Sequence, residues 1–147
     1  MPELSQKQAR ALIENAIASL LDPLQDAESL CRYFAPDYVQ EVDGVRLDFD
    51  GFIDHARVLK TSLRWGRATI ENLIVSGDTI ADIHVVDGEK TNGDKIRVKV
   101  IAFFTLRDGK IVRVDELTHL LEGNHADRDM GSRTSPSTPG HKVGRVA

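Results

Sequence analysis

The chain has little of what most cofactor sites require. Its single cysteine, Cys31, has no partner for an internal disulfide, and its five histidines are scattered without the spacing of a metal site. No glycine-rich phosphate loop follows an expected strand, and no serine or cysteine nucleophile has a recognisable setting. We therefore expect neither a metal nor another cofactor.

Basic clusters and long apolar runs are also missing. Lys and Arg number 19 against 23 Asp and Glu, which gives a formal net charge of −4. Binding to nucleic acids or anionic membranes usually requires clustered basic residues. The first residues lack the charged and then apolar pattern of a secretion leader, and no apolar run is long enough to span a bilayer. We expect a cytoplasmic protein that binds neither nucleic acid nor membrane.

The remaining composition suits one folded domain. The chain has 147 residues, of which 41% are hydrophobic and 29% charged, so it can bury a modest core. After Gly123 the residues are mostly polar, with scarcely any apolar side chain to offset the entropy of ordering. We expect a domain over residues 1–123 and a flexible, solvated tail over residues 124–147. Its basic residues, which could touch an acidic partner, are Arg128, Arg133, Lys142 and Arg145.

Three helices are expected in the N-terminal half. Ser5 and Gln8 form a capping box in front of apolar residues at helical spacing, which predicts a first helix. Asp26 is expected to cap a second, short helix that ends at Pro36. Asp50 is expected to cap a third helix with one apolar side.

Strands are expected in the rest of the chain. An extended region over residues 38–49 surrounds a turn at Asp43-Gly44, and alternating apolar residues predict strands over residues 68–75, 79–87, 94–107 and 110–121. Helices followed by a bent antiparallel meander make an α+β fold. A sheet that curls around helices encloses a pocket between them.

The last predicted hairpin carries the clearest chemical signal. Apolar residues alternate with polar ones from Ile96 to Leu106, so one face of this strand is core. We interpret Arg107-Asp108-Gly109 as a three-residue loop with its glycine in the left-handed conformation. That loop places Val100 opposite Glu116 and puts the Glu116 carboxylate on the apolar face.

A shorter turn would reverse this result. With a two-residue Asp-Gly turn, Arg113 and Asp115 would point inward, because a one-residue slip exchanges the two faces of a strand. We prefer the three-residue loop, because it buries Val112 and Val114 rather than an arginine and an aspartate.

Four segments resemble the nuclear transport factor 2-like superfamily and, within it, the SnoaL-like branch. They are Asp26-Ala27-Glu28, Tyr33-Phe34-Ala35-Pro36-Asp37, Gly77-Asp78, and Phe104 to Ile111, and together they span most of residues 5–122. The resemblance implies a cone-like α+β fold over residues 1–123, with three N-terminal helices on a strongly curved sheet. The branch includes polyketide cyclases, ketosteroid isomerases and limonene epoxide hydrolase, so the fold does not determine the activity.

The catalytic positions of two of these enzymes can be compared with the residues of this chain. The residues of ketosteroid isomerases would fall at or near Val42, at Ala18 and at Ala102, where this chain lacks the required side chains. The residues of limonene epoxide hydrolase would fall at Glu116, His84 and Val86, of which Glu116 alone keeps an acid. The resemblance, like the hairpin register, therefore places Glu116 in the pocket.

Glu116 and His84 are the candidate catalytic residues. A carboxylate in an apolar cavity has its pKa raised toward the working range of a general acid or base. His84 shares a strand face with Asp82 and Val86, and if that face is concave, the imidazole can share a proton with Glu116. The opposite face, which carries Ile83, is just as apolar, so the sequence leaves the orientation open. A structural role for Glu116, paired with Arg, Lys or a backbone donor, also stays open.

Further residues are candidates for the substrate-binding wall. They combine aromatic, polar and apolar side chains on the expected inner faces: Tyr38, His55, Trp65, Asp82, Val100, Ala102, Phe104, Val114 and Thr118.

Three functions remain from the sequence. The first is a cofactor-free isomerase, cyclase or hydrolase that acts on a small, largely apolar substrate through Glu116 and His84. The second is a protein that binds a small ligand in the same pocket without chemistry. The third is an interaction module that uses the outer sheet face, where Ile101 and Phe103 interrupt a polar row. A homodimer is expected in all three cases.

Overall fold

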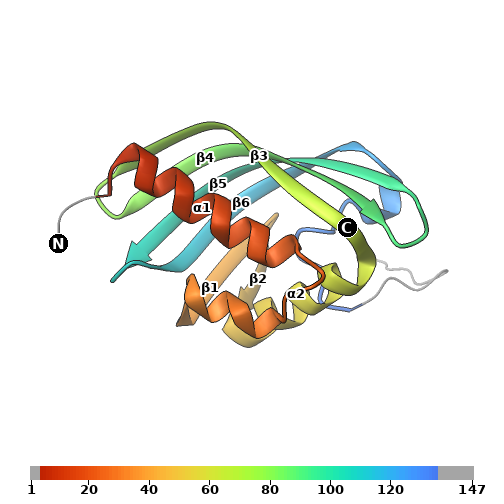
Figure 1. Ribbon diagram of the computed structural model, residues 1–147, viewed down its shortest axis with the longest axis horizontal. Helices are drawn as coiled ribbons and strands as arrows, with labels where there is room; N and C mark the ends of the chain where they lie inside the picture. Colours follow the sequence, from red (N-terminus) through yellow and green to blue (C-terminus); the bar gives the residue numbers. More distant parts are fainter. Residues whose placement is uncertain (1–3, 136–147) are drawn as a thin grey trace.

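A strongly curved six-stranded sheet that wraps around helices is the frame of the protein (Figure 1). The computed structural model describes residues 4–135. In chain order the elements are α1 (Gln6–Leu21), the 3-10 helix η1 (Ala27–Arg32), β1 (Phe34–Val42), β2 (Val45–Asp48), α2 (Phe49–Ser62), β3 (Leu63–Ser76), β4 (Thr79–Lys90), β5 (Lys95–Arg107), β6 (Lys110–Glu122) and the 3-10 helix η2 (His125–Asp127). The predicted cone-like α+β fold is confirmed.

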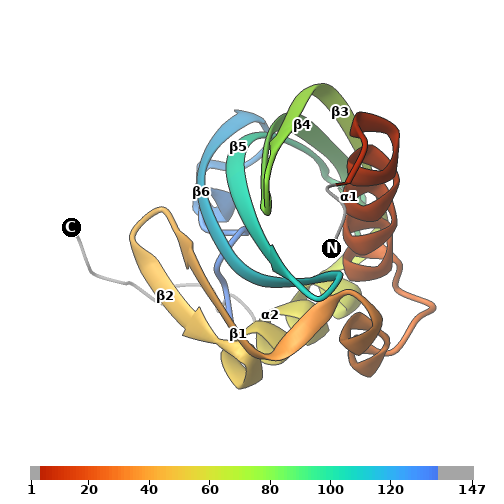
Figure 2. The ribbon, with the colours of Figure 1, turned by 90° about the vertical axis from the view of Figure 1, so that its left-hand side faces the viewer.

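The strands lie in the order β2-β1-β6-β5-β4-β3. Strands β3 to β6 form the expected antiparallel meander, whereas β1 pairs with β6 in parallel and with β2 in antiparallel orientation. The predicted purely antiparallel sheet is therefore extended by a mixed edge. Figure 2 shows β3 to β6 curling into an arc whose open side is covered by α1.

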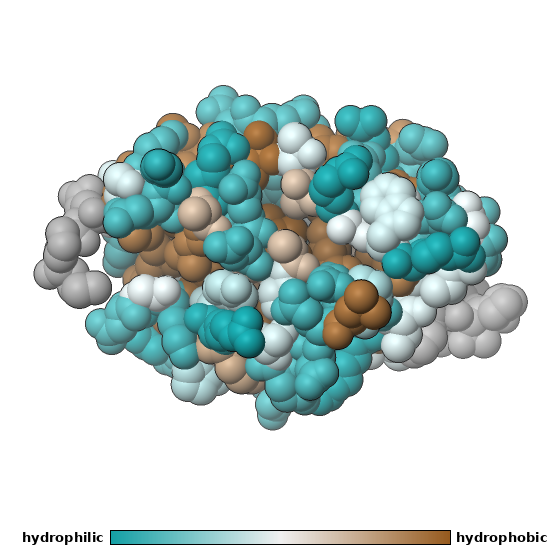
Figure 3. Space-filling model, in the orientation of Figure 1, coloured by the Kyte–Doolittle hydropathy of each residue, from teal (hydrophilic) through white to brown (hydrophobic). Residues whose placement is uncertain are grey.

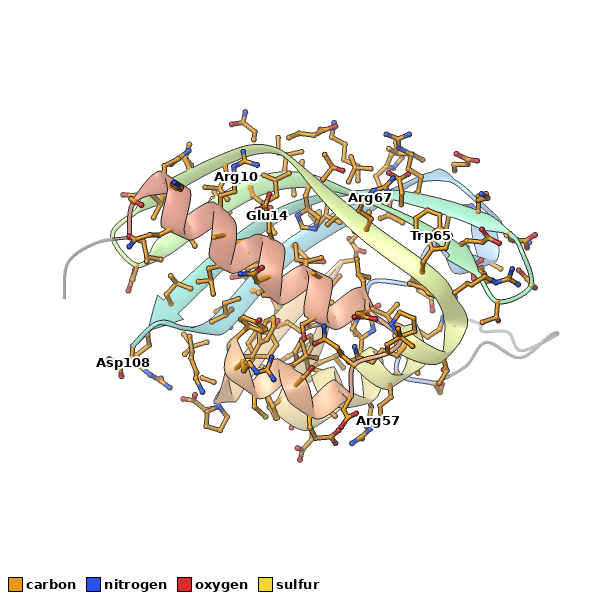
Figure 4. The ribbon with its side chains drawn as sticks, in the orientation of Figure 1. Arg10, Glu14, Arg57, Trp65, Arg67 and Asp108 are labelled. Atoms are coloured by element: carbon orange, nitrogen blue, oxygen red, sulfur yellow. The ribbon has the colours of Figure 1, made fainter. Side chains whose placement is uncertain are left out.

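Helix α1 fills the concave side of the sheet. The Ser5 hydroxyl accepts a hydrogen bond from the Gln8 amide at 3.0 Å, so the predicted capping box is present. Ala9 and Ile13 are fully buried, while the opposite side carries the exposed pair Arg10 and Glu14 (Figure 4). In Figure 3 the surface over this side is mostly hydrophilic, and apolar side chains gather in the recesses along it.

The predicted starts of the next two helices need correction. The segment after Asp26 is a single 3-10 helix, and the Asp26 side chain makes no capping hydrogen bond. Pro36 lies inside β1 rather than at a helix end, since the helix already stops at Arg32. Helix α2 is capped by Asp48, whose carboxylate accepts from the Gly51 amide at 2.9 Å, so Asp50 lies in the first turn.

The β5–β6 hairpin differs from the predicted register but keeps its faces. Asp108 and Gly109, with φ of 53° and 81°, form the two-residue turn, and Arg107 pairs with Lys110. Val112 then has no partner, because Leu106 pairs with Ile111 and Thr105 with Arg113. The turn is one residue shorter than predicted, and this β-bulge restores the missing residue within the strand.

The bulge sets the position of Glu116 in the sheet. Glu116 pairs with Ala102 rather than with Val100 as predicted, and Val100 pairs with Thr118. The predicted inward orientation of Glu116 is retained, although both the turn length and the pairing were wrong.

Aromatic and aliphatic side chains pack tightly in one half of the curved sheet. The rings of Phe34, Tyr38 and Phe52 lie 4.7–4.9 Å apart, and the paired residues Phe104 and Val114 belong to the same buried cluster. This half of the interior is solid core. Space remains further along β5, toward Val98 and Val100.

The chain after Gly123 continues along the domain at least as far as residue 135. Met130 belongs to the core, and Asp127 and Arg133 are buried. Lys90 Nζ contacts Asp127 Oδ2 at 2.7 Å. The expected boundary at residue 123 and the expected flexibility of the tail stay predictions, and two of its basic residues, Lys142 and Arg145, lie outside the described residues.

Candidate functional site

A pocket of about 100 Å³ lies between the concave face of the sheet, the two long helices and the C-terminal segment. Most of its lining is apolar, with a few polar groups. The residues are Leu21, Gln40, His55, Leu59, Leu63, His84, Val86, Ile96, Val98, Val100, Glu116, Thr118, Met130 and Gly131. Glu116 and His84, the candidate catalytic residues, thus face one cavity.

Glu116 lies in this pocket without a basic partner. Its pairing positions it between Val42 on β1 and Ala102 on β5, and its side chain is half-buried. No Lys or Arg forms an ion pair with its carboxylate within residues 4–135. Within residues 4–135, Glu116 is therefore not a structural acid paired with a basic side chain.

Burial is the main reason why the pKa of Glu116 rises from 4.5 to about 7. The nearby carboxylates of Asp82 and Asp43 raise the pKa further, while His84 lowers it. Near neutral pH both protonation states of Glu116 are therefore populated. This is the condition under which one carboxyl can both accept and return a proton.

His84 is on the concave face, which settles the orientation that the sequence left open. Its Nδ1 lies 3.0 Å from Oδ1 and 2.9 Å from Oδ2 of Asp82, whose side chain is fully buried. The carboxylate can only accept, so Nδ1 carries the hydrogen and donates a hydrogen bond to Asp82. Nε2 has no hydrogen-bond partner among residues 4–135 and is free to interact with a ligand.

Ala102 separates the two acids of the site. In the sheet register Asp82 pairs with Ala102, which pairs with Glu116, and His84 occupies the next row beside Val100. The methyl group of Ala102 leaves room between the longer side chains on the concave face. Glu116 and His84 both line the pocket, and no direct hydrogen bond joins them within residues 4–135.

A second polar element comes from β1. The Tyr38 hydroxyl donates to Gln40 Oε1 at 2.9 Å, and both side chains are buried. Burial raises the pKa of Tyr38 well above its usual value, with a further contribution from Glu116, so the phenol stays protonated. Gln40 was not predicted from the sequence, although alternation from Tyr38 places residue 40 on the same face.

His55 connects the pocket to the C-terminal segment. Its Nδ1 is 2.8 Å from the backbone oxygen of Arg133, and burial lowers the pKa of His55 below its usual value of 6.5. The neutral ring donates through Nδ1 and helps to hold the segment that carries Met130 and Gly131. No sequence signal pointed to these two lining residues, because they come from the expected tail.

Only some of the predicted wall residues reach the cavity. His55, Val100 and Thr118 line the pocket, whereas Tyr38, Ala102, Phe104 and Val114 lie in the adjoining core and Asp82 lies behind His84. The curvature of the sheet closes around the aromatic cluster, so inward-facing residues at that end contact each other rather than a cavity.

Trp65 lies outside the pocket, contrary to expectation. Its Nε1 donates to Glu89 at 3.2 Å, and the guanidinium of Arg67 lies 5.6 Å from its ring. Figure 4 shows Trp65 and Arg67 together on β3, at the end of the molecule opposite Asp108. Helix α2 ends at Ser62, so Trp65 lies on β3, where its ring is outside the cavity.

Neither a metal centre nor a membrane-spanning helix is found within residues 4–135. No group of three or more His, Cys, Asp or Glu side chains in this range is arranged to hold a metal ion. None of the described helices combines the length and apolar character needed to cross a membrane.

The comparison with known families settles the wider relationship. The model of the SnoaL-like domain matches residues 16–114. The chain belongs to the SnoaL-like family. This assignment, within the nuclear transport factor 2-like superfamily, confirms the resemblance seen in the sequence. A relative in Schizosaccharomyces pombe, the uncharacterized protein C11D3.04c, is 38% identical over 124 residues, which cover 84% of this chain and 95% of that protein.

Solved structures share the SnoaL-like fold at low sequence identity. AusH from Aspergillus nidulans superposes with a TM-score of 0.69 at 9% identity, covering 99% of this chain and 100% of that chain. TsrD from Streptomyces laurentii gives a TM-score of 0.65 at 19% identity, with coverage of 89% and 100%. These likenesses show the fold alone.

Proposed function

We propose that this SnoaL-like protein is a cofactor-free enzyme that moves a proton on a small, largely apolar substrate. The observation that carries the proposal is the Glu116 carboxyl, which lies in an apolar pocket without a basic partner among residues 4–135 and has a pKa of about 7. Glu116 is the acid–base group, and His84 assists it.

The arrangement gives each polar group a distinct task. Glu116 in its ionised form accepts a proton from the substrate and then returns it at another position or to another atom. Asp82 fixes the imidazole of His84 so that Nε2 faces the ligand. The surrounding Leu59, Val98 and other apolar side chains exclude water, which strengthens these interactions.

Two further observations support this proposal. Solved chains with the same fold carry provisional names as a polyketide cyclase, a hydroxylase and an isomerase, which are activities on small molecules. The pocket volume of about 100 Å³ is below the roughly 300–1,000 Å³ of most ligand sites, so the pocket takes a small substrate or the reacting end of a larger one.

A binding protein without catalysis is the second candidate. The same pocket supports it, because a ligand can bind beside Glu116 and His84 whether or not a proton is transferred. A homodimer is proposed for either function, since Ile101, Phe103 and Leu117 are exposed together on the outer face of neighbouring strands. Location in the cytoplasm stays a prediction.

Turnover of small ketones, epoxides and esters by wild-type protein and by Glu116→Gln tests the proposal. The amide has the shape of the protonated acid but cannot accept a proton, so we expect turnover to fall by about 10²–10⁴-fold. Asp115→Asn, on the outer face of the same strand, is the matched control and should keep wild-type activity. Equal turnover in Glu116→Gln would remove the acid–base role, and saturable binding without turnover would favour the binding protein.

A further inference from the structure

Gln40 carries a fully buried donor that has no partner in the described part of the protein. Gln40 is 4% exposed, and its Nε2 is the only buried side-chain nitrogen or oxygen without a hydrogen bond among residues 4–135. Buried amide groups are nearly always hydrogen-bonded, because burying an unsatisfied donor is costly. An unpaired donor on a residue that lines a cavity therefore requires a partner from outside the described residues, either a water molecule or a ligand atom.

Tyr38 fixes the direction in which this donor points. Its hydroxyl donates to Gln40 Oε1 at 2.9 Å and has no other acceptor within the described part of the chain. Rotating the amide by 180° would leave the Tyr38 proton without an acceptor. The Tyr38 ring is packed against the rings of Phe34 and Phe52, with centroid distances of 4.9 Å and 4.7 Å. The ring therefore cannot move its hydroxyl to another acceptor. The NH₂ group is thus directed away from Tyr38.

The neighbours of Gln40 restrict the charge of its ligand. Gln40 pairs with Val114 and the next inward residue, Val42, pairs with Glu116, so the amide and the acid lie diagonally across adjacent strands. A carboxylate or phosphate ligand would be repelled by ionised Glu116 and by the buried Asp82. An ammonium group has no lone pair to accept from Nε2. A neutral oxygen acceptor satisfies the amide without either conflict.

We propose that Gln40 Nε2 donates a hydrogen bond to the carbonyl oxygen of a small, neutral, largely apolar ligand and so fixes that ligand beside Glu116. Leu21, Leu63 and Ile96 contact its hydrocarbon part. The inference deepens the proposed function by naming the substrate class, but the binding step does not depend on proton transfer.

Two probes of matched shape test this contact in the full-length protein. Cyclohexanone carries the carbonyl oxygen, and methylenecyclohexane carries a CH₂ group in its place. Dissociation constants are measured by titration in ¹⁵N-labelled protein, and the preference is the ratio of the two constants. Comparing this ratio between variants cancels the different hydration of the two probes in water.

Gln40→Glu keeps an oxygen for Tyr38 but replaces the donor by an acceptor. We expect the preference for the ketone to fall about tenfold, as for the loss of one buried hydrogen bond. The double variant Tyr38→Phe, Gln40→Met removes both polar partners together, should fold, and should show the same loss. Gln25→Met, at a half-buried hydrogen-bonded glutamine outside the pocket, should keep the wild-type ratio.

The Gln40 side-chain NH₂ signal provides a second measurement. Cyclohexanone should shift one of its two proton resonances, whereas methylenecyclohexane should not. An unchanged preference in the Gln40 variants, an unmoved NH₂ signal, or no binding of cyclohexanone up to its solubility would each overturn the proposal. Glu116→Gln should keep the ketone preference, so failure of the acid–base role and failure of the Gln40 contact are separately visible.

Discussion

His84 Nδ1 lies 2.9 Å and 3.0 Å from the two carboxylate oxygens of Asp82, so one buried acid holds the imidazole ring in a single orientation. The pairing directs the other nitrogen, Nε2, toward the pocket that also contains Glu116. Asp82 therefore acts through His84 and is a positioning residue.

Replacing Asp82 by Asn should impair the reaction without closing the pocket. The amide introduced by Asp82→Asn can donate to Nδ1, which would move the imidazole proton to Nε2 and reverse its role. We expect kcat to fall by about 10–100-fold with little change in KM, as for other residues that orient a functional histidine. Steady-state kinetics at several pH values would measure the effect. Asp87→Asn, on the same strand but paired with Arg97 at the surface, should behave as wild type.

Glu116→Gln should stabilise the protein at high pH. Between pH 4.5 and about 7 the native state keeps a proton on Glu116 that the unfolded chain has lost, because its pKa is raised in the fold. The free energy of unfolding therefore falls as the pH rises through this window. The amide that replaces the carboxyl does not ionise, so we expect the variant to gain about 1–3 kcal/mol at pH 8 and nothing at pH 4.5.

Urea unfolding of the wild type and Glu116→Gln at pH 4.5, 6 and 8 would show this difference. Glu41→Gln, which removes a surface carboxylate, controls for the change in net charge. A gain that stays the same from pH 4.5 to pH 8 would mean that burial does not raise the pKa of Glu116.

His55→Leu should loosen the C-terminal segment. The substitution leaves the backbone oxygen of Arg133 without its donor, at a cost of about 1 kcal/mol, which corresponds to roughly fivefold faster local opening. Trypsin cleavage after Arg128 and Arg133 should accelerate to that extent. His125→Leu, at an exposed position in the same segment, should not change the rate.

The burial of His55 also makes the stability of the protein depend on pH in a direction that can be predicted. Burial lowers the pKa of His55, so below pH 6.5 the unfolded chain binds a proton before the native state does. Acidification from pH 6.5 toward the lowered pKa should therefore destabilise the wild type. This part of the acid sensitivity should be absent in His55→Leu, which thermal unfolding between pH 5 and pH 7 can resolve.

Phe103→Lys should prevent the proposed dimer. Phe103 is 56% exposed on the outer sheet face, beside the exposed Ile101, and a lysine there would bury an unpaired charge in a symmetric contact. Sedimentation equilibrium at micromolar concentration should give a dimer for the wild type and a monomer for the variant. Leu24→Lys, at an exposed leucine in the loop after α1, should leave the dimer intact. A monomeric wild type would contradict the outer-face proposal.

The regular parts of the chain could be predicted because their signals are local. The capping box at Ser5, the turn at Asp43-Gly44 and the meander strands depend on spacing and turn chemistry within a few residues, and all are confirmed. The cap of α2 was misplaced by two residues, because an acid precedes the helix at Asp48 and another follows at Asp50. Either can cap a helix, and only the path of β2 decides between them.

The pocket was less predictable, because its extent depends on contacts between distant segments. Glu116 and His84 were identified from strand alternation, which fixes a face but not what lies opposite that face. Phe104 and Val114 were expected to line the cavity and instead fill the core, because the sheet closes around the aromatic cluster. Met130 could not be anticipated, since nothing local in a polar segment indicates that one apolar residue will dock.

The unpaired Val112 makes the inner lining of β6 sensitive to insertions and deletions rather than only to substitutions. Removing one residue from this bulge would exchange the inward and outward residues of the strand beyond it while leaving the turn intact. A family built on this hairpin can thus acquire a new set of pocket residues in one mutational event. A relative without the bulge, if aligned to this strand without a gap, would be assigned the wrong acid.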